Sequence, residues 1–182
     1  MVVEIISVGN ELLTGTVVNT NAAFLAEQCV SLGFECFYQT VVGDDKSRLQ
    51  EVIKTAEKRA DIILINGGLG QADDDITKDS VKEVYDKATV LELENQNGST
   101  NGFILEEKKK QIILLPGSPK ELEPMFTEQV FPYLQEKTDL VIRTRTIKLC
   151  GISETEVNDA IADLMNEEQT PMIATYAKCG EV

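Results

Sequence analysis

Short apolar runs along the chain alternate with segments in which apolar residues recur every three or four positions. Val3 to Val8 is an apolar run that ends at Gly9, which predicts a β-strand. Phe34 to Val42 and Asp61 to Ile65 are expected to form two further strands. The run from Asp61 is almost wholly apolar, which is typical of a parallel strand that is covered by helices on both faces.

Segments with helical periodicity follow each of these runs. A helix is expected from Asn19 or Thr20 to about Leu32, because asparagine and threonine cap helix N-termini and Gly33 is a suitable C-terminal stop. The segment after Asp45 has apolar residues on one helical face, and residues from about 76 to 85 predict a third helix.

Three β-then-α units in succession imply parallel strands with right-handed crossovers. The expected fold class for residues 1–137 is therefore α/β, a three-layer αβα sandwich with a mostly parallel sheet. Phe103 to Leu105 and Ile112 to Leu115 predict two strands joined by a charged turn, and a helix that carries Leu122 follows. The stretch that begins at Val90 has no clear period and is expected to be irregular.

The character of the chain changes after Lys137. Residues 140–149 predict a strand, Ser153 is expected to cap a helix, and residues 172–176 predict another strand. Residues 138–182 are therefore expected to form part of a small α+β domain.

Composition narrows the chemistry that this fold can support. The 182 residues include no histidine, which excludes histidine-based acid–base catalysis and histidine-ligated zinc. The formal net charge is −14 and no basic face is visible, so we expect no nucleic-acid partner. No apolar run approaches the roughly 20 residues of a membrane helix, so we expect no membrane partner. Four widely spaced cysteines and the lack of a signal-peptide pattern predict reduced thiols and a cytoplasmic location.

One loop carries the strongest functional signal. It runs from Asn66 to Thr77 as Asn-Gly-Gly-Leu-Gly-Gln-Ala-Asp-Asp-Asp-Ile-Thr, after an apolar strand and before a helix. Glycines let a backbone approach a ligand closely, and a helix N-terminus favours anions. Asp74 and Asp75 can bind a divalent cation that bridges phosphates; the alternative is that they only cap the helix.

Three further loops end strands at the same expected edge of the sheet, where ligands bind in α/β folds. Residues 9–15, with Asn19 and Asn21 beyond them, place polar groups there, although a capped loop explains this pattern about as well. In the pair Asp44-Asp45, one aspartate suffices to cap the next helix and the other could face a ligand or metal. Residues 115–121, Leu-Pro-Gly-Ser-Pro-Lys-Glu, are either a structural turn or a binding loop.

Together these four loops resemble the molybdopterin-binding-type domain family, and more closely its version at the N-terminus of CinA proteins. The resemblance covers nearly the whole chain in order, through residues 4–15, 19–21, 39–44, 67–77, 97–98, 102–103 and 115–122. It implies a three-layer α/β sandwich that acts as a metal-dependent pyrophosphatase on ADP-ribose, giving AMP and ribose 5-phosphate. Many members also carry a nicotinamide-nucleotide amidase domain, which is not found in this sequence, so we expect no amidase activity.

The resemblance also implies roles for individual residues. Asp74, Asp75 and Asp44 would hold Mg²⁺ or a similar divalent cation, and Glu11 is the candidate general base beside the catalytic Asp74 and Asp75. The backbone amides of Gly67, Gly68 and Gly70 would bind phosphate oxygens. The full set of expected ligand contacts is Gly9, Asn10, Thr14, Asn19, Asn21, Asp44, Gly67, Gly68, Leu69, Gly70, Thr77, Gly117, Ser118, Pro119 and Glu121. Family members often form dimers, so the resemblance is compatible with a homodimer.

Two departures from the family pattern keep an alternative open. Gln71 and Ala72 stand where the family usually has proline and threonine, and the stretch from Tyr85 to Asn95 is shorter than usual. Each departure could remove a contact to the ligand or the metal. The alternative is a non-catalytic module that binds a nucleotide or a pterin-like phosphate ligand, or a fragment whose activity needs the missing parts.

Overall fold

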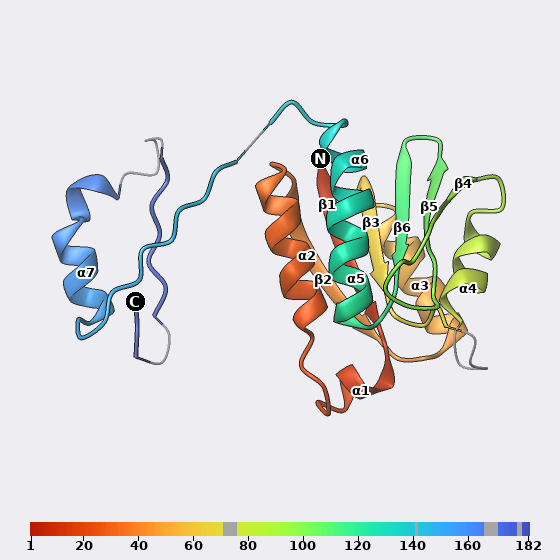
Figure 1. The fold of residues 1–182 in the computed structure, drawn as a ribbon, viewed down its shortest axis with the longest axis horizontal. Helices are drawn as coiled ribbons and strands as arrows, with labels where there is room; N and C mark the ends of the chain where they lie inside the picture. Colours follow the sequence, from red (N-terminus) through yellow and green to blue (C-terminus); the bar gives the residue numbers. More distant parts are fainter. Residues whose placement is uncertain (71–75, 141, 166–170, 178–179) are drawn as a thin grey trace. The chain divides into compact units, whose positions relative to one another are not determined.

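The computed structural model describes residues 1–70, 76–140, 142–165, 171–177 and 180–182. The chain divides into two compact units, Met1–Arg143 and Thr144–Val182. The first unit is built around a six-stranded sheet with helices packed on both of its faces (Figure 1). This arrangement confirms the expected three-layer α/β fold.

The sheet has the strand order β2-β1-β3-β6-β5-β4. Four neighbouring strands are parallel: β2 (Glu35–Val42), β1 (Val2–Val8), β3 (Ile62–Asn66) and β6 (Lys110–Leu115). β5 (Gly102–Glu107) pairs antiparallel with β6, as the charged turn predicted, and β4 (Thr89–Leu93) pairs antiparallel with β5. The sheet is therefore mostly parallel, with an antiparallel extension at one edge.

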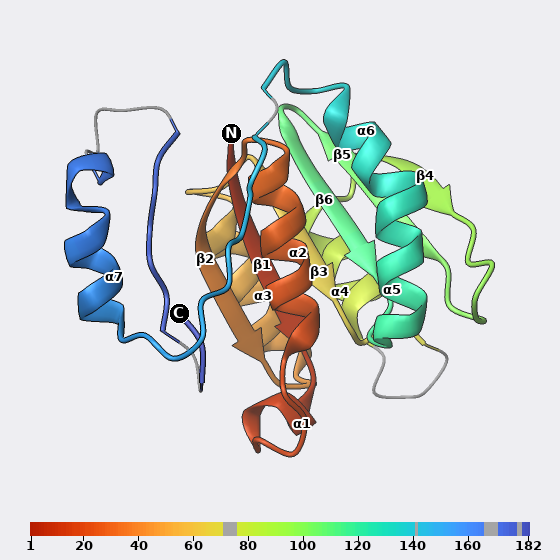
Figure 2. The same ribbon diagram turned by 60° about the vertical axis from the view of Figure 1, so that its left-hand side comes forward.

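The helices form the two outer layers (Figure 2). One layer contains α2 (Thr20–Ser31) and a continuous helical segment made of α5 (Pro119–Met125), a π-helical turn (Phe126–Val130) and α6 (Phe131–Gln135). The other layer contains α3 (Lys46–Ala56) and α4 (Thr77–Val84). Each layer buries its own apolar core against the sheet, and β3 is buried over its whole length.

Local sequence signals set the limits of the first two long helices. The Asn19 side chain caps α2 by accepting a hydrogen bond from the Ala22 N–H at 3.1 Å. The helix ends before Gly33, whose φ of 78° lies in the left-handed region that glycine adopts readily. Asp45 caps α3 by accepting from the Arg48 N–H at 2.9 Å.

The strand order places a topological switch between β1 and β3. The chain leaves β1 toward β2 over one face of the sheet, and leaves β2 toward β3 over the other face. The loops that follow β1 and β3 therefore diverge, and a crevice is expected between them at the carboxyl edge of the sheet. The short helix α1 (Asn10–Leu13) and the starts of α2 and α5 lie at this edge (Figure 1).

One edge of the sheet differs from the sequence expectation. The stretch after Val90 is part of the edge strand β4, where Val90 and Leu91 are about half exposed. Such a strand lacks the buried side that produces a recognisable alternation of apolar and polar residues. The pairing of β1 with β2 also shifts register between Val3 and Glu4, which leaves Phe37 without a paired residue.

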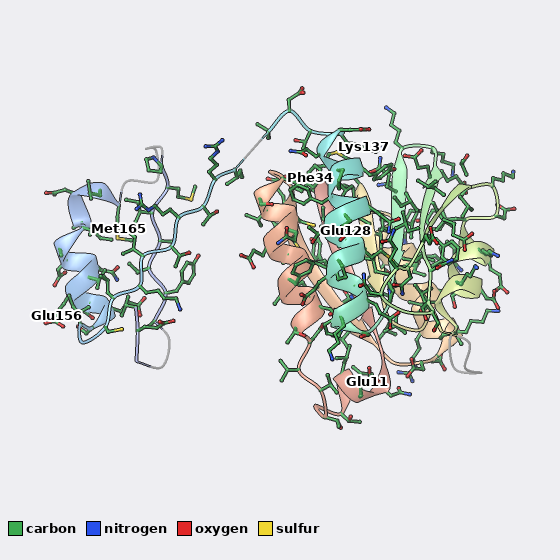
Figure 3. The ribbon with its side chains drawn as sticks, in the orientation of Figure 1. Glu11, Phe34, Glu128, Lys137, Glu156 and Met165 are labelled. Atoms are coloured by element: carbon green, nitrogen blue, oxygen red, sulfur yellow. The ribbon has the colours of Figure 1, made fainter. Side chains whose placement is uncertain are left out.

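The second unit contains the predicted helix. α7 (Glu154–Ala160) begins with a capping box formed by Ser153 and Glu156, and a short 3-10 turn (Ala162–Leu164) follows; Figure 3 labels Glu156 and Met165 on this segment. The strands expected at 140–149 and 172–176 are absent from the described residues. Leu149 and Val182 instead form an isolated pair through two backbone hydrogen bonds of 2.9 Å.

None of the helices in the described part of the chain combines the length and the apolar character that crossing a membrane requires.

Candidate functional site

A cleft of about 260 Å³ lies at the carboxyl edge of the sheet, at the topological switch. Its walls come from the loops that follow β1, β2, β3 and β6, together with the start of α2. This is the position at which open α/β sheets bind ligands, and the volume is near the lower end of small-molecule sites. The lining residues are Val8, Gly9, Glu11, Leu12, Val17, Val18, Asn19, Thr20, Asn21, Asp44, Asn66, Gly67, Gly68, Gly117 and Pro119.

Two glycines after β3 form the floor of the cleft. Gly67 has a φ of 93°, and a Cβ atom at this position would lie 2.2 Å from the Val8 carbonyl oxygen. Gly68 has a φ of 60°, and its Cβ would lie 2.5 Å from the Thr77 hydroxyl. Glycine therefore fits at these two positions, beside the end of β1 and the start of α4, where a side chain would not.

The Gly67 amide does not have the role that the sequence predicted. The expectation was that it binds ligand oxygens, but its N–H donates to the Leu115 carbonyl at 3.1 Å. This hydrogen bond joins the β3 loop to the end of β6. Gly67 therefore shapes the cleft through its lack of a side chain, while the Gly68 N–H has no acceptor among the described residues.

A chain of side-chain amides links the walls. The Asn66 side chain donates to the Ser7 hydroxyl at 2.9 Å, and the Asn19 side chain donates to the same hydroxyl at 3.0 Å. The Asn21 side chain donates to the Gly117 carbonyl at 2.7 Å. These bonds fix the start of α2 against β1, β3 and the loop after β6.

Asn21 is left with an unused acceptor. Because the Gly117 carbonyl can only accept, the Asn21 amide must present its nitrogen there and its oxygen elsewhere. The Oδ1 atom is buried and has no hydrogen-bond partner among the described residues. A buried acceptor of this kind is stabilised when water or a ligand donates to it.

Asp44 and Asp45 divide the two roles that the sequence left open. Asp45 caps α3, whereas Asp44 is half-buried and lines the cleft. The Asp44 carboxylate accepts from the Asn10 N–H at 3.0 Å, and the Asn10 side chain accepts from the Asp44 N–H at 3.3 Å. This reciprocal pair holds the loops after β1 and β2 together and keeps the Asp44 carboxylate at the cleft.

Glu11 is the second acidic residue of the cleft. It lies on α1, at the end of the first unit where the parallel strands finish (Figure 3), and its side chain is exposed. Its carboxylate folds over Gly9, since a Cβ on Gly9 would lie 2.4 Å from Oε1. Because the Glu11 side chain is exposed, it can also turn toward a bound molecule or a water.

The charge of the cleft favours a bound cation. Its described lining includes Glu11 and Asp44 but neither lysine nor arginine. Carboxylate, amide and backbone carbonyl oxygens are the hard donors that Mg²⁺ binds. Within the described residues, no group of three or more acidic, cysteine or histidine side chains is positioned to hold a metal on its own.

The predicted metal ligands Asp74 and Asp75 lie outside the described residues, as do Gln71, Ala72 and Asp73. Their place in the site stays a prediction. The described residues on either side, Gly68 and Thr77, are joined by a backbone hydrogen bond of 2.9 Å. Both ends of the loop are therefore anchored beside the cleft.

Several expected contact residues support the cleft without lining it. Thr77 is fully buried, and its hydroxyl donates to the Gly67 carbonyl at 2.9 Å. Leu69 packs against the core between the sheet, α3 and α4. The Thr14 hydroxyl is bonded to the Glu11 carbonyl at 3.2 Å. Asn10, Gly70 and Ser118 are also outside the lining.

Glu121 belongs to a neighbouring loop. Its carboxylate accepts from the Asn95 side chain at 2.5 Å, and Gly98 leaves space for it, since a Cβ there would lie 2.1 Å from Oε2. The Asn95 side chain also donates to the Thr100 carbonyl at 2.8 Å. Glu121 therefore holds the loop between β4 and β5, and it is not among the residues that line the cleft.

Sequence reasoning did not select Ser7 and Asn66 as site residues, although they form the centre of the amide chain. Both are polar residues at the carboxyl ends of mainly apolar strands and are almost fully buried. A buried polar residue needs hydrogen-bond partners, so such a position is a signal that a strand end faces a polar site.

The comparisons with known proteins agree with this architecture. Residues 4–136 match the family described as "Probable molybdopterin binding domain", and residues 144–182 match the "Damage-inducible protein CinA KH domain". A competence-damage inducible protein of Clostridium beijerinckii is 37% identical, over 98% of this chain and 52% of its own length. The chain thus spans about half the length of the relatives that it matches.

Solved structures show the same fold. The CinA protein of Thermoplasma acidophilum, described as having unknown function, is 28% identical with a TM-score of 0.64, over 69% of this chain and 94% of that one. The molybdopterin biosynthesis enzyme MoaB of Thermus thermophilus is 22% identical with a TM-score of 0.61, over 74% and 96%. The second likeness establishes the fold alone.

Proposed function

This chain belongs to the CinA family, with a molybdopterin-binding-type domain followed by a CinA KH domain, and from that premise we propose that its cleft hydrolyses a nucleotide-sugar diphosphate. ADP-ribose is the proposed substrate, and AMP and ribose 5-phosphate are the products. Magnesium or a similar divalent cation is the proposed cofactor.

One observation carries the proposal. Nine of the predicted site residues come from four separate loops and line one cleft: Gly9, Glu11, Asn19, Asn21, Asp44, Gly67, Gly68, Gly117 and Pro119. They combine a glycine floor, side-chain amides and two carboxylates at the carboxyl edge of the sheet. A floor without side chains admits the oxygens of a diphosphate, and the carboxylates suit a cation that neutralises it.

The chemistry of the donors fits a hard metal ion. Asp44 would hold it from the described part of the cleft, with Asp74 and Asp75 as the proposed partners from the loop after Gly70. A bound Mg²⁺ would offset the charge of the diphosphate and polarise the phosphorus–oxygen bonds.

The protein's own groups would position the reactants. Glu11 is exposed at the rim, where its carboxylate can accept a proton from an attacking water. The Gly68 N–H would donate to a phosphate oxygen, whereas the Gly67 N–H already donates to the Leu115 carbonyl. The Asn21 oxygen would accept from a hydroxyl or from a fixed water beside the ligand.

Product analysis tests turnover. The whole chain is incubated with ADP-ribose in magnesium, and AMP is measured by chromatography, with Glu11→Gln and Asp44→Asn as variants. AMP formation that depends on magnesium and falls at least tenfold in both variants is expected, since each removes a group from the reacting centre. Equal AMP formation by the parent and both variants would reject this assignment.

The alternative function is ligand binding without turnover. It is favoured by the observation that the described lining offers only Glu11 and Asp44 as carboxylates, and by Gln71 and Ala72 in the loop after Gly70. Binding of ADP-ribose by calorimetry, together with no AMP above a protein-free control, would decide for this alternative.

A further inference from the structure

We propose that the free edge of β2 is a docking surface for a second copy of this chain, so that two first units join their sheets through antiparallel pairing of β2 with β2. The pairing is centred on Gln39, which lies opposite the Gln39 of the second copy. This inference is independent of the proposed function, because the contact uses the edge of the sheet and not the cleft.

β2 is an edge strand that is open to pairing. Within the described residues it has a neighbouring strand on one side only (Figure 2). It contains neither lysine nor proline, which commonly protect edge strands from pairing with another chain. Phe37, Tyr38 and Val41 are 65%, 40% and 38% exposed. The edge therefore combines exposed apolar side chains with the lack of two common protective residues.

The backbone of β2 offers hydrogen-bonding groups at this edge. The Val42 carbonyl accepts from the Gly9 N–H at 3.0 Å, so the backbone groups of Val42 face the β1 side. Successive residues of a strand point their N–H and C=O groups to opposite sides. The groups of Val41 and Gln39 therefore point to the free edge, where an added strand can bond to them.

A two-fold axis at Gln39 brings compatible side chains opposite each other. In this register the two Gln39 residues form a hydrogen-bonded pair, Phe37 lies opposite the second copy's Val41, and Tyr38 lies opposite the second copy's Thr40. Pairs of an aromatic with a β-branched residue are stabilising cross-strand pairs. The surface is thus complementary to itself, as a closed two-fold dimer requires.

The same register suits the negative charge of the chain. Each copy carries a net charge of −14, so a contact between two copies is favourable only where it avoids opposing like charges. Glu35 is the one charged residue of β2, and the register places it opposite the second copy's Gly43. No two like charges therefore lie directly opposite each other in the contact.

A buried carboxylate orders the side chains that would meet. Glu4 is fully buried and accepts from the Thr40 hydroxyl at 2.9 Å. The Arg59 guanidinium donates to both Glu4 oxygens at 2.9 and 2.7 Å and lies 3.7 Å from the centre of the Tyr38 ring. Tyr38 and Thr40 are therefore held before the second copy docks, which lowers the conformational entropy that association costs.

Charged variants at Gln39 test the contact. Gln39→Lys and Gln39→Glu each place two like charges opposite each other across the two-fold axis. Thr89→Lys and Thr89→Glu are the matched controls, because Thr89 is an exposed polar residue of the other edge strand, β4. Sedimentation equilibrium of the whole protein measures the Kd of the dimer, and thermal melting confirms that each variant is folded.

The parent should form dimers, and each Gln39 variant alone should raise the Kd of the dimer at least about tenfold. An equimolar mixture of Gln39→Lys and Gln39→Glu should recover the affinity, because lysine then lies opposite glutamate. Both Thr89 variants should dimerise as the parent does. Recovery in the mixture is specific to a residue that lies opposite its own copy.

Hydrogen exchange tests the strand pairing itself. The N–H groups of Gln39 and Val41 point to the free edge, so they should exchange rapidly at concentrations below the Kd. Above the Kd, where the second copy's strand accepts from them, their exchange should be slower. A dimer without this protection would show that the two copies meet through another surface.

Other results would also overturn the proposal. A parent that stays monomeric at millimolar concentration would exclude the dimer. A Kd that is unchanged in the Gln39 variants, or raised equally in the Thr89 variants, would exclude the β2 edge as the specific contact. Failure of the mixture to recover the affinity would exclude the register centred on Gln39.

Discussion

At Gly67 the backbone has a φ of 93°, and an added Cβ would lie 2.2 Å from the Val8 carbonyl oxygen. Gly67→Ala should therefore destabilise the first unit by more than the left-handed φ alone costs, which is about 1–2 kcal/mol. Gly15→Ala is the matched control, because Gly15 has a φ of 72° and nothing within 4 Å of its Cβ. Urea unfolding followed by circular dichroism measures both, and equal losses would show that the close approach contributes nothing.

Cys29 predicts a pH dependence of stability. Burial of the thiol raises its pKa from 9.0 to about 12, with a smaller contribution from Cys36. The Cys29 thiol therefore holds its proton more tightly in the folded state than in the unfolded state. Its contribution to the free energy of unfolding is complete below pH 9 and is lost as the pH rises toward 12. The expected slope is about 1.4 kcal/mol per pH unit in this window.

Urea unfolding at several values between pH 8 and pH 11 tests this dependence against Cys29→Ala. The variant should be less stable at pH 8, because it leaves a small cavity in the core. Its stability should fall less steeply with pH than that of the parent. Parallel curves for the two proteins would show that the Cys29 thiol does not cause the slope.

The adjacent residues Asp44 and Asp45 show how far the roles of single residues could be predicted from the sequence. The sequence indicated that one of Asp44 and Asp45 caps a helix and that the other could face a ligand, but it could not assign them. The assignment depends on Asn10, which is 34 residues away in the sequence. Its N–H donates to the Asp44 carboxylate, and its side-chain oxygen accepts from the Asp44 N–H. Such long-range pairs leave no local pattern in a single sequence.

At the scale of the element, variants of Asp44 and Asp45 should have different effects, one on ligand binding and the other on the stability of α3. Asp45→Ala should cost about 1 kcal/mol of stability, because the α3 N-terminus loses its cap, and should leave ligand affinity unchanged. Asp44→Asn should keep the stability, since an amide oxygen can still accept from the Asn10 N–H, and should weaken metal-dependent binding. Thermal melting and calorimetry on both variants provide the test, and a binding loss in Asp45→Ala would reverse the assignment.

The strands and helices of the first unit were largely predictable, and the exceptions share a cause. β1, β2, β3 and the four long helical segments were expected from the sequence, as was a mostly parallel sheet, whereas the order of the strands in the sheet was not predicted. β4 was missed because it is an exposed edge strand with little buried surface. The strands expected at 140–149 and 172–176 do not form in the described residues, where many apolar side chains such as Ile147 and Met172 are exposed.

The candidate site was predictable in its loops but less so in its individual groups. Parallel topology alone placed the loops after β1, β2, β3 and β6 at one edge, and nine expected residues line the cleft there. Which polar atoms already have hydrogen-bond partners within the protein depends on tertiary contacts. The hydrogen bond of the Gly67 amide and the structural roles of Thr77 and Glu121 therefore could not be predicted from the sequence.

At the scale of the whole molecule, every residue that lines the cleft belongs to the first unit, Met1–Arg143. A protein that ends at Arg143 should therefore unfold in one cooperative transition and bind ADP-ribose with the affinity of the 182-residue chain. Calorimetric titration of both proteins tests this expectation. A clearly weaker affinity of the shorter protein would show that residues 144–182 contribute to the site.

The central claim is that this acidic cleft binds a diphosphate through a divalent cation. The chain carries a net charge of −14, and Glu11 and Asp44 line the cleft, so a bare diphosphate meets like charge there. Calorimetric titration of the whole protein with ADP-ribose, in magnesium and then in EDTA, tests the claim most directly. We expect one binding site per chain in magnesium and an affinity at least about tenfold lower in EDTA, whereas equal affinity in both buffers would contradict the account.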